Sequence, residues 1–188
     1  MKVIFLDYDG VVNNIIWDSE GKKANYGYPN QGKVNDFQAC QWVSEFCEKY
    51  EYSIVVTSTW RRSDNYIECL YRGGLRPSVK VSGRIDLDLE YKYKRSELIA
   101  KYLEEHPEID GYLIFDDEYD EGTPKNHLVL CDHDGFYYTE YHKAIQLHNT
   151  LEAKKEYSDL LYLRTDNTGA HIEQAIRFSN EKVQNKSK

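Results

Sequence analysis

The hydrophobic positions of the chain fall into short unbroken runs that alternate with longer amphipathic stretches. The runs are only a few residues long, are rich in β-branched and aromatic side chains, and end at polar residues or glycine. Such runs are typical of strands that are buried on both faces of a parallel sheet. The predicted strands lie at residues 3–6, 54–56, 79–81, 111–115 and 128–130.

Between these runs, apolar residues recur at spacings of three and four, which predicts amphipathic helices. Residues 82–93 are acidic and aromatic without a clear period, so we expect an irregular segment there. The predicted helices are one capped by Asn35 or Asp36 that continues to Tyr50, a short one capped by Ser63 and closed by Gly73-Gly74, one from Lys94 to Pro107, and one capped by Thr139 that continues through Leu147.

The alternation of strands and helices indicates an α/β fold. Parallel neighbouring strands need a long crossover connection, usually a helix, and that crossover is almost always right-handed. We therefore expect a three-layer, Rossmann-like parallel sheet with helices on both faces. In such sheets, ligands bind in the crevice beyond the carboxyl ends of the strands.

Polar groups follow the predicted strands at the places where that crevice would form. The first run stops at Asp7 and Asp9, followed by Gly10, and the run at 111–115 stops at Asp116 and Asp117. Two carboxylates in one crevice can hold a hard cation through oxygen ligands and leave one carboxylate free to react. A glycine at position 10 permits the tight turn that such a pair requires.

The stretch Asp7-x-Asp9-Gly10-Val11-Val12-Asn13 resembles motif I of the haloacid dehalogenase (HAD) superfamily, whose commonest members are Mg²⁺-dependent phosphatases. The resemblance implies that Asp7 is the nucleophile that forms an aspartyl-phosphate. It implies that Asp9 protonates the leaving oxygen and then activates water. It also implies Mg²⁺ ligands from the Asp7 carboxylate, the Asp9 backbone carbonyl and Asp116, with Asp117 nearby.

The other motifs of the superfamily follow in order. Thr57 ends the second apolar run and resembles the hydroxyl of motif II, although a shift of one residue would make Ser58 that group. Lys94 resembles the cation of motif III, and Lys92 and Arg95 remain alternatives. The superfamily sheet order would be 5-4-1-2-3, which places Asp7 beside Asp116.

Several further stretches narrow the resemblance to the HAD domain of Swiss Army Knife RNA-repair proteins. They are D-G-V-V-N, T-S-T-W-R, K-R-S-E-L-I, D-D-E and L-V-L-C-D-x-D-G-F. The resemblance covers residues 1–149, and residues 150–188 are expected to form a C-terminal helical extension. The loop at 14–32 is too short for a full cap domain, so a capless member with an open crevice is expected.

The composition limits the classes of partner. The chain has 188 residues with a formal net charge of −8, which suits one soluble domain and argues against a general nucleic-acid binder. No run approaches the ~18 apolar residues of a membrane span. The first run is no signal peptide either, because the charged residues Asp7 and Asp9 interrupt its apolar stretch. The cysteines form no C-x-x-C pair and are expected to be reduced and packed. We therefore expect a cytoplasmic protein.

Together these features predict a Mg²⁺-dependent phosphohydrolase acting on a phosphomonoester. An open crevice suits a polynucleotide end or a nucleotide, with Ser58 and Arg61 as candidate substrate-binding residues. Arg61 beside Trp60 could bind a phosphate and stack a base. Two alternatives remain: a phosphotyrosine-type protein phosphatase, and a non-catalytic binding module that keeps the fold. The sequence does not specify the oligomeric state.

Overall fold

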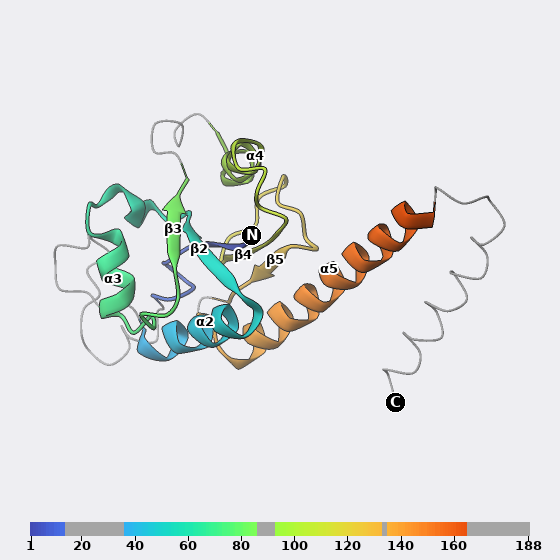
Figure 1. Ribbon diagram of the computed structural model, residues 1–188. Coiled ribbons are helices and arrows are strands. Elements are labelled where there is room, and N and C mark those ends of the chain that lie inside the picture. Colours follow the sequence, from blue (N-terminus) through green and yellow to red (C-terminus); the bar gives the residue numbers. More distant parts are fainter. Residues whose placement is uncertain (14–35, 86–92, 133–134, 165–188) are drawn as a thin grey trace. The chain divides into compact units, whose positions relative to one another are not determined.

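The computed structural model describes residues 1–13, 36–85, 93–132 and 135–164, with side chains as far as residue 158 (Figure 1). The predicted loop at 14–32, Lys92 and the C-terminal segment after Arg164 lie outside these residues. The chain divides into two compact units, residues 1–148 and 149–188. The functional boundary expected near residue 149 stays a prediction.

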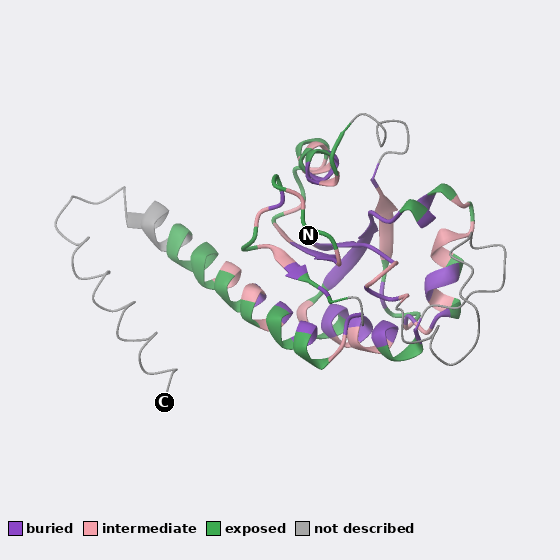
Figure 2. Cartoon of the chain, turned by 180° about the vertical axis from the view of Figure 1, so that it is seen from behind, coloured by how far each residue is buried: buried purple, intermediate pink, exposed green. Residues whose placement is uncertain are grey.

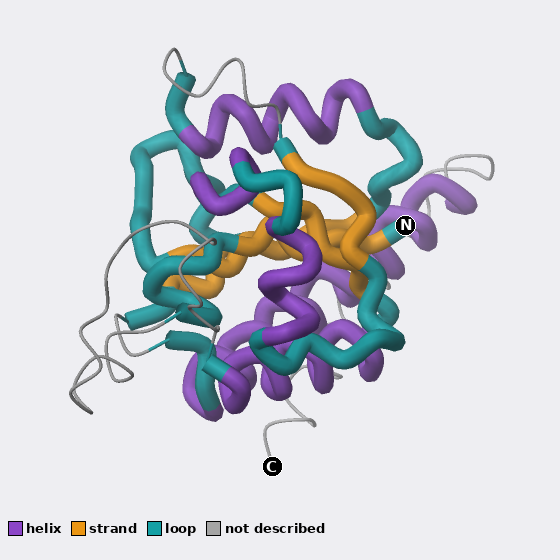
Figure 3. Tube along the Cα trace, turned by 90° about the vertical axis from the view of Figure 1, so that its left-hand side faces the viewer, coloured by secondary structure: helices purple, strands orange, loops and turns teal. Residues whose placement is uncertain are grey.

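Five parallel strands form one sheet in the order β3-β2-β1-β4-β5. This is the predicted order counted from the other edge, and it confirms the Rossmann-like α/β fold. The strands are β1 (Lys2–Leu6), β2 (Tyr52–Val56), β3 (Val81–Arg84), β4 (Gly111–Asp116) and β5 (Leu128–Leu130). In Figure 3 the strands form a central layer with helices on both sides.

The central strand β1 is buried on both faces, as its unbroken apolar run predicts. Residues 3–6 have no exposed surface, and β1 pairs with β2 on one side and β4 on the other. One face packs against α4 (Arg95–Glu105), where Val3 and Phe5 join Leu98 and Ile99 in one apolar cluster. Figure 2 shows this buried sheet layer in purple.

The opposite face is covered by α2 (Phe37–Tyr50) and by the first turns of α5 (Tyr138–Arg164). The ring of Phe46 on α2 lies 5.7 Å from that of Phe115 on β4, and 6.2 Å from that of Tyr141 on α5. Asp36 caps α2 as expected, because its carboxylate accepts hydrogen bonds from two backbone amides of the first turn. The sheet therefore packs through apolar side chains on both of its faces.

Some element boundaries differ from the predictions. The third strand occupies Val81–Arg84 rather than 79–81, so part of the segment expected to be irregular is a strand. This edge strand is only half-buried, and an edge strand needs no apolar run. After β2 the chain forms a 3₁₀ turn, η2 (Thr59–Arg62), before α3 (Tyr66–Arg72), whose cap position is Asn65 rather than Ser63. The last helix begins at Tyr138, one residue before the predicted cap Thr139.

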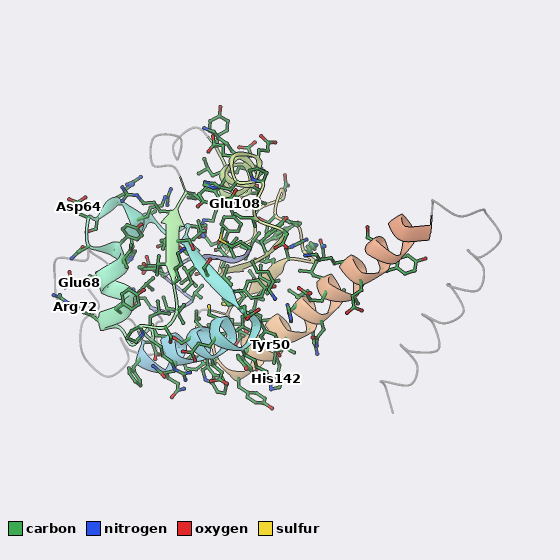
Figure 4. The ribbon with its side chains drawn as sticks, in the orientation of Figure 1. Tyr50, Asp64, Glu68, Arg72, Glu108 and His142 are labelled. Carbon is green, nitrogen blue, oxygen red and sulfur yellow. The ribbon has the colours of Figure 1, made fainter. Side chains whose placement is uncertain are left out.

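All four cysteines are buried and free, as expected of packed thiols. No helix among the described residues is both long enough and apolar enough to cross a membrane. A pocket lies along α3 and is lined in part by Asp64, Glu68 and Arg72, which are labelled in Figure 4. None of its lining residues follows the carboxyl end of β1 or β4, where the acidic residues lie.

Candidate active site

The sheet register brings the candidate site residues to one edge. Asp7 follows β1, and its backbone amide donates to the carbonyl of Phe115 on β4 at 3.0 Å. Thr57 follows β2, and its amide donates to the carbonyl of Leu6 at 2.9 Å. Because these strands are parallel, their carboxyl ends meet, and Asp7 lies between Thr57 and Asp116.

Three carboxylates gather there. Asp7, Asp116 and Asp117 each offer an oxygen, and these oxygens all lie within 4.8 Å of one another. Asp7 and Asp116 are buried and Asp117 is half-buried. A small set of hard oxygen donors is the kind of site that Mg²⁺ occupies, with water at its remaining positions. The donor set therefore fits a divalent cation.

The electrostatics of the cluster also favour a cation. The pKa of Asp7 is raised to about 7, chiefly by burial; the charge of Arg95 opposes this rise, and the neighbouring Asp116 carboxylate adds to it. Burial likewise raises the pKa of Asp116 and of Asp117. Negative charge in this cluster is thus costly, and a bound divalent cation would favour the ionised carboxylates.

Gly10 allows Asp117 to approach the turn after β1. Its φ is +73°, in the left-handed region that glycine adopts at little cost. A Cβ at this position would lie 2.2 Å from Oδ2 of Asp117. The absence of a side chain at residue 10 is therefore a condition for the three-carboxylate cluster.

The cation that reaches the cluster is Arg95, not Lys94. Nη1 of Arg95 lies 3.3 Å from Oδ2 of Asp7 and also forms an ion pair with Asp116. The Lys94 side chain is 58% exposed, and its Nζ lies 3.7 Å from Glu121. The reason is the helix start: Lys94 is the extended cap residue of α4, whereas Arg95 is its first helical residue. The structure thus favours an alternative that the sequence left open.

Residues 3–138 match the model of the family described as the HAD domain in Swiss Army Knife RNA repair proteins. The chain belongs to this family. No curated protein and no solved structure matches it. Membership indicates a phosphohydrolase, and the superfamily generally uses a divalent metal, for which the acidic cluster offers a site.

Two hydroxyls follow β2 of the HAD domain, and they lie in different environments. The side chain of Ser58 lies near the Asp7 carboxylate and acts to lower its pKa. Oγ1 of Thr57 is buried, and among the described atoms it has no hydrogen-bond partner. A buried hydroxyl without a partner is costly unless something else binds it. The structure therefore leaves Thr57 available to a substrate, while Ser58 lies near the nucleophile candidate.

Asp9 lies outside the three-carboxylate cluster, and its carboxylate is held by two neutral donors. Nδ2 of Asn13 donates to Oδ1 at 2.7 Å, and Nε1 of Trp60 donates to Oδ2 at 3.0 Å. The ligand role expected of Asp9 concerns its backbone carbonyl, and it stays a prediction.

Arg61 does not lie where a surface substrate contact would need it. It is 2% exposed, and its Nη1 donates to the carbonyl of Thr57. Its own carbonyl accepts from Nη1 of Arg84 at 2.6 Å. The structure therefore places Arg61 inside the loop after β2, where its contacts support the loop backbone. The exposed cation of this turn is Arg62.

Asp120 is a residue of the HAD domain that the sequence did not single out. Its carboxylate accepts from the backbone amides of Ser96 and Gly122, both at 2.9 Å, and from the Thr123 hydroxyl at 3.1 Å. It thereby ties the start of α4, which carries Arg95, to the loop after β4. Asp120 follows Asp116 by four residues, but nothing in the sequence indicates that it would cap a helix that precedes it in the chain.

Proposed function

We propose that this HAD domain is a Mg²⁺-dependent phosphohydrolase that cleaves a phosphomonoester through an aspartyl-phosphate on Asp7. The observation that supports it most is the meeting of Asp7, Asp116 and Asp117 at one edge of the sheet with Arg95 beside them. Phosphoryl transfer depends mainly on positioning and on neutralising charge, and this edge offers both.

Asp7 is the proposed nucleophile. A carboxylate oxygen of Asp7 bonds to phosphorus as the bond from phosphorus to the leaving oxygen breaks, which divides one difficult displacement into two easier ones. Arg95 places a fixed positive charge beside that oxygen. The carboxylates of Asp7, Asp116 and Asp117, with the backbone carbonyl of Asp9, would hold Mg²⁺. Bound there, Mg²⁺ supplies neutralisation of the negative charge shared by nucleophile and phosphoryl group.

Asp9 is the proposed acid and base. Its carboxylate gives a proton to the leaving oxygen in the first step and takes one from the attacking water in the second, so it ends the cycle unchanged. Its place outside the three-carboxylate cluster supports this role, because it is not needed there as a ligand. Thr57 is the proposed hydroxyl that bonds the transferring phosphoryl group, since its Oγ1 is buried without a described partner.

A polynucleotide end or a nucleotide is the proposed substrate class. The family is described from RNA repair proteins, which supports nucleic acid as the context. The loop after β1 is too short for a full cap domain, which favours a crevice that admits a large substrate. Arg62, which follows β2 and is exposed, is the proposed contact for a substrate phosphate. The net charge of −8 restricts such binding to local contacts.

An assay of aryl phosphate hydrolysis tests the proposal. Wild type should be active with Mg²⁺ and inactive with EDTA, and Asp7→Asn should abolish activity. Asp64→Asn is the matched control, because Asp64 is an exposed carboxylate on the loop before α3. Activity that survives Asp7→Asn would contradict the nucleophile role, and an inactive wild type would support a non-catalytic binding module.

A substrate panel then decides the class. It comprises oligonucleotides with 3′- or 5′-phosphates, mononucleotides and phosphopeptides. Preference for a polynucleotide end or a nucleotide is the expected result. Preference for phosphotyrosine peptides would instead support the protein phosphatase alternative.

A further inference from the structure

The turn after β2 lies beside both carboxylates of the pair that follows β1. Ser58, just before this turn, lies near Asp7 and acts to lower its pKa, and Trp60, two residues later, donates its indole Nε1–H to Oδ2 of Asp9 at 3.0 Å. The two strands are neighbours in the sheet. The 3₁₀ turn η2 thus bonds the proposed acid, and its cap residue lies near the proposed nucleophile.

The indole of Trp60 is held firmly in this place. Trp60 is only 8% exposed, and its backbone amide donates to Oγ of Ser58 at 3.4 Å. Its ring packs against that of Tyr8, with centroids 5.5 Å apart. Tyr8 is itself fixed by a hydrogen bond from its hydroxyl to the carbonyl of Tyr66 at 2.8 Å. The donor that meets Asp9 therefore has little freedom to move.

The kind of donor matters as much as its rigidity. Asp7 faces the charged guanidinium of Arg95, whereas the donors that the structure describes around Asp9 are the neutral groups of Trp60 and Asn13. A neutral donor orients a carboxylate without adding a charge, and each carboxylate oxygen has a second lone pair for another partner. Such a pair of contacts fixes the direction of the Asp9 carboxylate and leaves each of its oxygens able to accept a further hydrogen bond.

We infer that Trp60 is a positioning residue that aims the Asp9 carboxylate at the leaving oxygen through its indole N–H. The inference rests on the proposed function, because it assumes that Asp9 is the acid. Trp60 itself does not touch the reacting atoms in this account. Its effect on the rate passes through Asp9.

The consequence depends on the leaving group. A basic alkoxide leaving group needs a proton as its bond to phosphorus breaks, whereas a nitrophenolate leaves almost unaided. Trp60→Phe keeps the ring but removes the N–H. We expect it to lower kcat/KM, which reports the step in which the leaving group departs, about tenfold or more on an alkyl phosphate and less than about threefold on p-nitrophenyl phosphate, because general acid catalysis contributes ~10²–10⁴-fold.

Two further variants separate this role from a loss of stability. Asp9→Asn should show the same dependence on the leaving group, only larger, and Asp9→Asn with Trp60→Phe should be no worse than Asp9→Asn alone. Trp42→Phe is the matched control, because Trp42 is half-buried on α2 and its ring packs on Tyr141 at 5.0 Å, in the layer opposite α4. It should leave the ratio of the two rates unchanged.

A measurement that needs no turnover tests the contact itself. In ¹⁵N-labelled protein, the indole N–H signal that disappears in Trp60→Phe should move in Asp9→Asn and stay in Asp64→Asn. An equal loss of kcat/KM on both esters, or an indole signal that does not move in Asp9→Asn, would overturn the inference while leaving a phosphatase. A wild type inactive on every ester would instead overturn the proposed function, and the positioning role with it.

Discussion

Nη1 of Arg95 lies 3.3 Å from Oδ2 of Asp7, while the neighbouring Lys94 is directed to Glu121 at the surface. Two adjacent cationic side chains at the start of one helix therefore lie in different environments, one at the acidic cluster and one at the surface. The difference gives a matched pair of variants.

Arg95→Ala should lower kcat/KM on an aryl phosphate by about 100-fold or more, since removal of one group that stabilises transition-state charge costs ~10²–10³ in rate. Lys94→Ala should stay within about threefold, because an exposed pair contributes little. Steady-state kinetics in saturating Mg²⁺, below the melting temperature of each variant, measure both. A larger loss of kcat/KM in Lys94→Ala than in Arg95→Ala would instead indicate Lys94 as the cation of motif III.

Asp7→Asn should stabilise the metal-free protein at alkaline pH. Burial raises the pKa of Asp7 from 3.8 to about 7, so the folded state keeps a proton that the unfolded state has lost between these values. Stability then falls as pH rises through that window, by about 1.4 kcal/mol per pH unit for one proton. Asparagine carries no such charge.

Urea unfolding in EDTA at pH 5 and pH 8 measures this effect. Asp7→Asn should be more stable than wild type at pH 8 by on the order of 1–3 kcal/mol, with a smaller difference at pH 5. Mg²⁺ should raise the stability of wild type more than that of the variant. A difference that is the same at both pH values would show that the buried charge of Asp7 is not the cause.

Gly10→Ala should weaken Mg²⁺ binding by about tenfold or more, as changes next to metal ligands commonly do. The new Cβ would lie 2.2 Å from Oδ2 of Asp117, at a φ of +73° that costs non-glycine residues ~1–2 kcal/mol. The Mg²⁺ concentration for half-maximal activity, and calorimetric titration, measure the change.

Gly111→Ala is the control, because the nearest atom to its Cβ would be Cγ of the flexible Lys2 side chain at 3.2 Å. It should leave Mg²⁺ dependence unchanged. Normal Mg²⁺ affinity in Gly10→Ala would mean that Asp117 is not a ligand.

Asp120→Ala should reduce both stability and activity. Its carboxylate holds the amide of Ser96 at 2.9 Å, directly after Arg95, so its loss frees the start of α4. We expect a loss of ~1 kcal/mol, as for other helix caps, together with about tenfold in kcat, because small misplacements in an active site are costly. Glu121→Ala, whose side chain is 92% exposed, is the control. A drop in melting temperature with full activity would show that Arg95 does not depend on this contact.

The sequence predicted the sheet because burial on both faces requires unbroken apolar runs, and β1, β2 and β4 have them. The sequence-based prediction misplaced β3, because an edge strand is not buried on both faces and needs no unbroken apolar run. The acidic cluster was predictable as well, since Asp7 and Asp116 each follow a strand end and parallel strands end together.

Details that depend on the direction of a side chain, rather than on its position in the sequence, were not predictable. Lys94 is the extended cap residue of α4 and Arg95 its first helical residue, so the position at which the helix starts decides which of the two faces the acids. Burial of Arg61 depends on the carbonyl of Thr57, four residues earlier, which accepts a hydrogen bond from its guanidinium because η2 turns the chain back. The Trp60 contact joins residues 51 positions apart and requires a packed indole. Sequence patterns contain no signal for such contacts.

The central claim is that Asp7 becomes covalently phosphorylated during turnover. The direct measurement is an acid quench of the Mg²⁺-loaded protein in the act of hydrolysing ³²P-labelled p-nitrophenyl phosphate, with the labelled peptide identified by mass spectrometry. Label is expected on the peptide that contains Asp7, stable in acid, released by hydroxylamine and absent from Asp7→Asn. Turnover with no label on wild type, or equal label on Asp7→Asn, would contradict it.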